Sequence, residues 1–217
     1  MEPRPKNPPL QRLAALAVAT LGMAALRTQF DALQDAPGLG ALQDRLWRMA
    51  AFFTILTNAL VTVHMLAVAL HWRIGAARAA GLLLSIAAVG IVYHLILARL
   101  WNPQGLAWWA DLGMHTGMPL AYGLWWLLLA PKGVVARDLP GWLIWPAAYC
   151  AYALTRGALT GFWPYPFLDA DALGWPQVAL NLAGMLAAFA LGGWAILTLA
   201  RRVSRRDQRV GTGTSPR

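Results

Sequence analysis

Charge and cysteine are scarce in this chain. Of its 217 residues, only 12% are Asp, Glu, Lys or Arg, whereas a soluble globular domain usually carries about 25%. Cys150 is the only cysteine, which excludes an internal disulfide and a metal cluster held by several cysteines. Hydrophobic residues make up 59% of the chain, and the mean hydropathy is +0.49. Because these residues come in long blocks rather than with a helical period, we predict an integral membrane protein.

Six apolar stretches approach the roughly 20 residues that a membrane-spanning helix needs. They cover residues 10–27, 47–71, 79–100, 108–130, 139–160 and 177–200, and Pro, Gly, Asn and Asp punctuate the segments between them. We therefore predict an all-α integral membrane protein in which residues 1–200 form a bundle of six transmembrane helices. Residues 201–217 are rich in arginine and are predicted to be a disordered cytoplasmic tail.

The distribution of Lys and Arg predicts the orientation of this bundle. Most of these residues lie near the N-terminus, in the second and fourth loops, and in the C-terminal tail. The opposite side carries only Arg27, Arg45, Arg48, Arg99 and Arg156. Both termini are therefore predicted to face the cytoplasm, with the chain integral to the plasma membrane; the bias toward Arg, Ala and Gly indicates a bacterial inner membrane. The first stretch also resembles a cleaved signal peptide, an alternative that leaves five spans.

Polar residues within the predicted spans gather at one depth. Thr54, Asn58, His94, Asp111 and His115 all fall within roughly 5–15 Å of the outer ends of their spans, at about 1.5 Å per helical residue. This coincidence predicts a polar chamber that opens toward the outer leaflet. An ionisable side chain at such a depth is costly unless it is paired, hydrated or used, so His115 is a candidate functional residue.

Helical spacing within this polar band favours nucleophilic catalysis. Asp111 and His115 are four residues apart, as are Thr54 and Asn58, so each pair shares one helix face. A threonine hydroxyl becomes a nucleophile when a base takes its proton, and histidine is the usual base. A carboxylate that holds the imidazole in the right tautomer completes such a triad. We therefore predict Thr54 as the nucleophile, with Thr57 as the neighbouring alternative, His115 as the base and Asp111 as its orienting residue.

Two further residues are predicted to bind the substrate, together with Thr57 if it is not the nucleophile. Asn58 and Arg156 would stabilise an oxyanion or a substrate carboxylate. For Arg156 there is an alternative role, in which its guanidinium extends to the outer lipid headgroups. The catalytic pair has a structural alternative too, because a membrane threonine commonly bonds the carbonyl four residues before it. Small residues spaced by four, which allow close helix packing, occur at Gly113, Gly117, Gly157 and Gly161.

No cofactor and no metal are predicted. The alternative is haem, for which His94 and His115 would be the facing pair, because His64 and His71 share a helix. The expected partners are membrane lipids and a lipid-like ester substrate. Nucleic acid is not expected, since contact with phospholipid accounts for the basic tail. The oligomeric state is left open, with a homo-oligomer among the alternatives.

Three segments resemble one family of membrane proteins. They are Gly113-Met114-His115-Thr116 followed by Pro119, the run TGFWPYPFLD at Thr160–Asp169, and Phe52-Phe53-Thr54. Together they are similar to the androgen-induced and androgen-dependent membrane protein family and its bacterial six-span relatives. The animal members are threonine hydrolases that cleave fatty acid esters of hydroxy fatty acids.

The resemblance implies a catalytic pair in this chain. The histidine motif falls on His115, and the Phe-Phe-Thr context favours Thr54 over Thr57. The run Thr160–Asp169 is interpreted as a lid or rim at the outer face. The chain departs from the family where Pro119 is shifted by one position, and where Arg156 and the following glycine replace other polar residues.

Two functional hypotheses follow for this sequence. The first is a membrane-embedded lipid-ester hydrolase that uses Thr54 and His115. The second is a non-enzymatic lipid-binding or transport-like protein that uses the same chamber. They differ in the distance between the Thr54 hydroxyl and the His115 ring, because catalysis requires about 2.6–3.2 Å or one bridging water.

Overall fold

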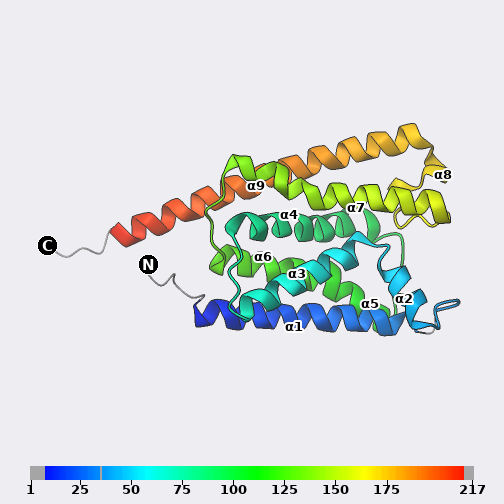
Figure 1. Ribbon diagram of the computed structural model, residues 1–217, viewed down its shortest axis with the longest axis horizontal. Coiled ribbons are helices and arrows are strands. Elements are labelled where there is room, and N and C mark those ends of the chain that lie inside the picture. Colours follow the sequence, from blue (N-terminus) through cyan, green and yellow to red (C-terminus); the bar gives the residue numbers. More distant parts are fainter. Residues whose placement is uncertain (1–7, 35, 213–217) are drawn as a thin grey trace. The chain divides into compact units, whose positions relative to one another are not determined.

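The computed structural model describes residues 8–34 and 36–212, with side chains as far as residue 204, and these ranges form helices joined by short connections (Figure 1). The α-helices are α1 (Pro9–Ala32), α2 (Leu42–Met49), α3 (Phe53–Ala69), α4 (Ala76–Val92), α5 (Leu106–Leu112), α6 (Met118–Leu129), α7 (Leu139–Thr160), α8 (Ala170–Leu173) and α9 (Trp175–Thr212). Two π-helical segments, η1 (Tyr93–Leu97) and η2 (Gly113–Gly117), and two 3₁₀ turns, η3 (Ala136–Asp138) and η4 (Pro166–Leu168), complete the described elements. No strand occurs within these ranges, which confirms the predicted all-α fold.

Three helical segments in the described part of the chain are long and apolar enough to cross a membrane. They are Pro9–Ala32, Ala76–Leu97 and Trp175–Ser204, and a fourth span results if α2 and α3, which are bent by 93° at their junction, count as one. The predicted stretches 108–130 and 139–160 are helical too. The first is divided by η2 into shorter pieces, and the second, α7, contains Trp, Tyr and Pro residues and Arg156, which lower its hydropathy.

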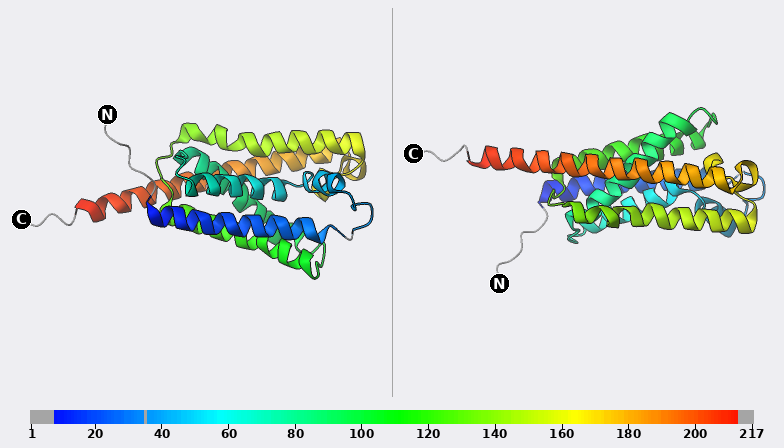
Figure 2. Two further views of the ribbon diagram at one scale, coloured as in Figure 1. Left: turned by 60° about the horizontal axis from the view of Figure 1, so that its bottom comes forward. Right: turned by 90° about the horizontal axis from the view of Figure 1, so that it is seen from above.

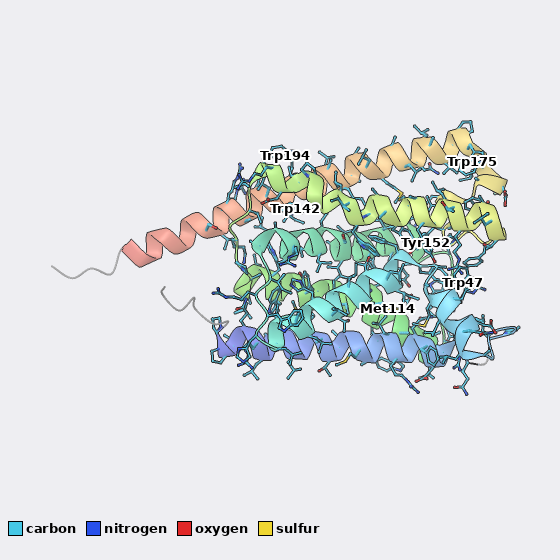
Figure 3. All side chains as sticks on the ribbon, in the orientation of Figure 1. Trp47, Met114, Trp142, Tyr152, Trp175 and Trp194 are labelled. Atoms are coloured by element: carbon cyan, nitrogen blue, oxygen red, sulfur yellow. The ribbon has the colours of Figure 1, made fainter. Side chains whose placement is uncertain are left out.

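Exposed apolar side chains accompany these long helices (Figure 3). Leu13, Leu95 and Leu191, one on each of the three segments, expose 66%, 75% and 71% of their surface. Extensive apolar surface is rare on a soluble monomer and marks contact with lipid or another protein. The exposed leucines therefore agree with the membrane association that the hydropathy predicts.

The chain divides into two compact units, where the sequence predicts a single bundle. Among the described residues, one unit comprises residues 8–34, 36–74 and 85–130, and the other comprises residues 75–84 and 131–212. The first unit therefore contains α1, α2, α3, the later part of α4, and the continuous helical run from Leu106 to Leu129. Every predicted site residue except Arg156 lies in this first unit.

In the first unit α1 packs against α3 and against the run α5–η2–α6 (Figures 1 and 2). Small residues on α1 and on that run allow the close approach. A Cβ added at Gly22 would lie 2.1 Å from Thr62 Oγ1, and one added at Gly113 would lie 2.9 Å from Ala25 Cβ. Gly117 has ordinary contact distance to Leu21. The prediction of close packing at Gly113 is thus confirmed, with α1 as the neighbour.

In the second unit α7 and α9 pack side by side, and α8 packs against α9 (Figure 2, right). At the end of α7, Gly157 faces the Trp163 ring, because a Cβ there would lie 2.2 Å from it. Gly161 has a different role: its φ of 67° is left-handed, and it ends the helix as a C-cap. Of the two glycines predicted to allow close packing, Gly157 does so, whereas Gly161 caps the helix.

The run Thr160–Asp169 folds into a tied connection between α7 and α9. Trp163 Nε1 donates to Asp171 Oδ2 at 2.8 Å, and the Tyr165 ring stacks on Phe167. Asn181 Nδ2 of α9 donates to the Phe167 carbonyl oxygen at 2.8 Å. The polar and aromatic groups of this run thus contact other residues of the second unit.

The last helix continues beyond residue 200, where the sequence predicts a disordered tail. The backbone of α9 is helical through Thr212, and residues 213–217 lie outside the described part of the chain.

Candidate active site

Two residues of the candidate site lie in π-helical segments of the first unit. Tyr93 begins η1, and His115 is the central residue of η2. Pro119 has no N–H to donate to the His115 carbonyl, so the α-helical pattern cannot pass unbroken through this turn. Gly90 of α4 lies close by, because a Cβ there would be 3.2 Å from the His115 carbonyl oxygen. Single π-helical turns inside α-helices are frequent at functional sites.

Thr54 and His115 come together although 61 residues separate them. The Thr54 hydroxyl oxygen lies 3.3 Å from His115 Nε2. Thr54 is the second residue of α3 and exposes 7% of its surface. The distance is slightly longer than the productive range of about 2.6–3.2 Å, as is common in structures without substrate. Of the two threonines that the sequence left open, Thr54 is the one that the structure shows beside the histidine; Thr57 is fully buried in the same helix.

Asp111 holds the other nitrogen of the imidazole ring. His115 Nδ1 lies 3.2 Å from the Asp111 carbonyl oxygen, to which it hydrogen-bonds, and 3.1 Å from carboxylate oxygen Oδ1. Both oxygens are acceptors, so this network assigns the proton to Nδ1. In the neutral imidazole, Nε2 then carries no proton and faces Thr54 as an acceptor.

Tyr93 is a member of this cluster that sequence reasoning missed. Its hydroxyl donates to Asp111 Oδ2 at 2.5 Å, and its ring stacks on the His115 ring with centroids 3.8 Å apart and planes 14° apart. The one signal in the sequence is its place next to His94, in the predicted polar band.

Asn58 joins the helix of Thr54 to the segment of His115. Its amide nitrogen donates to the Thr54 carbonyl oxygen at 2.8 Å and to the Met114 carbonyl oxygen at 3.3 Å. Met114 lies in the interior of the first unit (Figure 3). Asn58 is fully buried. Because its amide group already serves two backbone carbonyls, Asn58 fixes the two segments relative to each other.

Arg156 lies in the second unit, on α7. It is buried, Nη1 donates to the Tyr152 hydroxyl at 3.0 Å, and its guanidinium lies 5.9 Å from the centre of the Phe162 ring. A guanidinium can interact favourably with an aromatic face at this distance. Its predicted contact with a substrate carboxylate stays a prediction.

The other histidines of the first unit have different neighbours. His94 Nε2 lies 3.0 Å from the Thr116 hydroxyl, and His64 Nε2 lies 3.5 Å from the Tyr122 hydroxyl. His94 and His115 thus each contact a different threonine, Thr116 and Thr54 respectively. Among the described residues, no group of three or more His, Cys, Asp or Glu side chains is arranged to hold a metal ion.

Comparison of the chain with protein-family profiles, with curated proteins and with solved structures gives no match.

Proposed function

We propose that this protein is a membrane-embedded hydrolase of lipid esters, with Thr54 as the nucleophile and His115 as the general base. The observation that supports this most directly is the 3.3 Å separation of Thr54 Oγ1 from His115 Nε2. The Asp111 carboxylate at the opposite ring nitrogen adds to it. A nucleophile, a base at hydrogen-bond distance and a third group that orients the base are the recurring components of covalent acyl transfer.

The first half of the reaction transfers the acyl group to the protein. Thr54 Oγ1 attacks the ester carbonyl carbon while His115 Nε2 takes the hydroxyl proton. The tetrahedral intermediate then collapses, the bond from the acyl carbon to the alcohol oxygen breaks, and His115 returns the proton to the leaving alcohol. Asp111 stabilises the imidazolium that exists between the two proton transfers.

The second half of the reaction releases the acid. A water molecule attacks the acyl-threonine carbon, and His115 Nε2 takes one of its protons. The bond between the acyl carbon and Thr54 Oγ1 breaks, and the proton returns to that oxygen. The net reaction consumes one ester and one water and yields one carboxylic acid and one alcohol. The amide nitrogen of Asn58 already donates to two backbone carbonyls, so we do not assign stabilisation of the oxyanion to Asn58.

The surroundings favour a lipid substrate. The buried apolar cluster of Ala25, Met49, Ile55, Ala110 and Met114 includes the sequence neighbours of both reacting residues, Ile55 beside Thr54 and Met114 beside His115, so the pair lies in apolar surroundings. The resemblance of the His115 and Thr54 segments to the androgen-induced and androgen-dependent family supports a fatty acid ester as the substrate class. Arg156 remains our candidate for a substrate carboxylate.

The proposal includes a membrane arrangement. We propose six spans in a bacterial inner membrane, with both termini in the cytoplasm and the Thr54–His115 pair near the outer leaflet. The distribution of Lys and Arg along the sequence supports this orientation. A lipid ester would then enter laterally from the outer leaflet.

A fluorophosphonate probe tests the covalent mechanism directly. In membranes that contain the full chain, we expect the wild type to be labelled through Thr54 and Thr54→Ala to be unlabelled. We expect His115→Ala to be labelled about 10² to 10⁴ times more slowly, the usual contribution of a general base.

The matched control is Thr20→Ala. Thr20 also lies on a helix of the first unit, but its hydroxyl is exposed and bonds the Leu16 carbonyl oxygen at 3.0 Å. This variant should be labelled like the wild type. Labelling that is equal in wild type and Thr54→Ala would contradict the mechanism and favour the non-enzymatic lipid-binding function, which predicts a bound lipid that survives His115→Ala.

A further inference from the structure

We propose that Tyr93 is a positioning residue of this site, which holds Asp111 with its hydroxyl and His115 with its ring. The inference rests on the proposed function and assigns a role to a side chain that no motif singled out. Its basis is that one residue contacts both the base, His115, and the partner of that base, Asp111, from a helical segment other than theirs.

The hydroxyl contact determines which way the Asp111 carboxylate faces. Tyr93 donates to Oδ2 at 2.5 Å, and Oδ1 lies 3.1 Å from His115 Nδ1. Oδ1 makes no other hydrogen bond among the described residues. With Oδ2 held by Tyr93, rotation of the carboxylate would break a charge-assisted hydrogen bond, which is the stronger kind. The tyrosine therefore keeps Oδ1 directed at the imidazole.

The ring contact restricts the imidazole itself. The Tyr93 and His115 rings are nearly parallel, with 14° between their planes and 3.8 Å between their centres. A stacked ring on one face prevents the imidazole from tilting in that direction, so Nε2 stays aimed at Thr54. Precise support of this kind matters because a displacement of about 1 Å can cost roughly 10²-fold in rate.

The two contacts predict different effects for two substitutions. Tyr93→Phe keeps the ring and removes only the hydroxyl. At saturating fluorophosphonate we expect labelling about tenfold slower than in the wild type, as for loss of a hydrogen bond to a charged group, with little change in the half-saturating concentration. Tyr93→Leu also removes the stacked ring and should be slower still.

A double-mutant cycle identifies the route by which the hydroxyl acts. In an Asp111→Ala background, Tyr93→Phe should slow labelling no further, because the hydroxyl has lost its acceptor. Tyr122→Phe is the matched control: it removes another buried tyrosine hydroxyl of the first unit, which lies 3.5 Å from His64 Nε2, and should leave the labelling rate unchanged. Wild-type labelling by Tyr93→Phe, or an equal slowing in both backgrounds, would overturn the proposal.

Thermal unfolding of the same variants in detergent separates this proposal from the proposed function. Tyr93→Phe should lower the Tm by roughly 3 °C in the wild type and by clearly less in Asp111→Ala. If the wild type is not labelled above Thr54→Ala, the hydrolase fails, and the role of Tyr93 in orienting its base fails with it. If the wild type is labelled but Tyr93→Phe lowers the Tm equally in the wild type and in Asp111→Ala, the hydrolase stands and only the Tyr93–Asp111 contact is overturned.

Discussion

At the scale of single residues, the position of Thr54 in its helix decides what its hydroxyl does. Thr20, Thr62 and Thr155 each donate to the carbonyl four residues earlier, as membrane threonines commonly do. Thr54 is the second residue of α3, so the residue four before it lies outside that helix. Its hydroxyl lies 3.3 Å from His115 Nε2. The sequence identified the residue type and its motif, whereas the place of Thr54 at the start of its helix came from the structure.

Asn58 carries a prediction at this scale. Asn58→Leu removes the side-chain hydrogen bonds to the Thr54 and Met114 carbonyls, and the loss of two such bonds should cost about 1–3 kcal/mol of the free energy of unfolding. Labelling per folded molecule should also slow, because Asn58 ties the nucleophile's helix to the base. Thermal unfolding and probe labelling of the same sample measure the two effects.

The control for Asn58 is Asn181→Leu. Asn181 also donates its amide nitrogen to a backbone carbonyl, that of Phe167, but it lies in the second unit. It should lower the Tm without changing the labelling rate per folded molecule. A wild-type rate in Asn58→Leu would refute the positioning role.

At the scale of elements, the site depends on the close approach of α4 to η2. Gly90 allows this approach, because a Cβ there would lie 3.2 Å from both the His115 carbonyl oxygen and Pro119 Cβ. The sequence shows a glycine in an apolar stretch, and nothing in the local pattern identifies its neighbour. The π-helical form of η1 and η2 was likewise not predicted, since the apolar pattern is the same in α and π turns.

Gly90→Ala tests this packing. The added methyl group must displace the His115 backbone by a few tenths of an ångström, so we expect labelling to slow by roughly tenfold. Gly184→Ala is the matched control, because Gly184 is also helical and a Cβ there meets nothing within 4 Å. Equal labelling rates in the two variants would show that the Gly90 contact does not position His115.

At the scale of the whole molecule, hydropathy and charge predict a membrane protein with a defined orientation. The helices agree with membrane association, with three candidate spans in the described chain and a fourth if α2 and α3 count together. The proposed six-span topology makes a further statement, that residues 33–41 and residues 131–138 lie on opposite sides of the membrane. Cys150 is the only cysteine, which makes this statement easy to test.

Single cysteines introduced in a Cys150→Ser background provide the measurement. Gly40→Cys and Gly133→Cys form a matched pair, because a Cβ at either position meets nothing within 4 Å. In spheroplasts, a membrane-impermeant maleimide should react with Gly40→Cys and not with Gly133→Cys. In inverted membrane vesicles the pattern should be reversed. Reaction of both from one side would exclude the six-span arrangement.

The sequence by itself determined the all-helical, apolar character of the chain, and it predicted Thr54 (with Thr57 as the alternative), Asp111 and His115 as site residues. These features depend on composition and on local spacing, because residues four positions apart in a helix lie on the same face. Only the tertiary structure decided that α3 meets η2, that Asn58 bonds the Met114 carbonyl, and that Tyr93 completes the cluster. These contacts join residues 61, 56 and 18 positions apart, and they depend on how helices pack, which no local pattern in the sequence specifies.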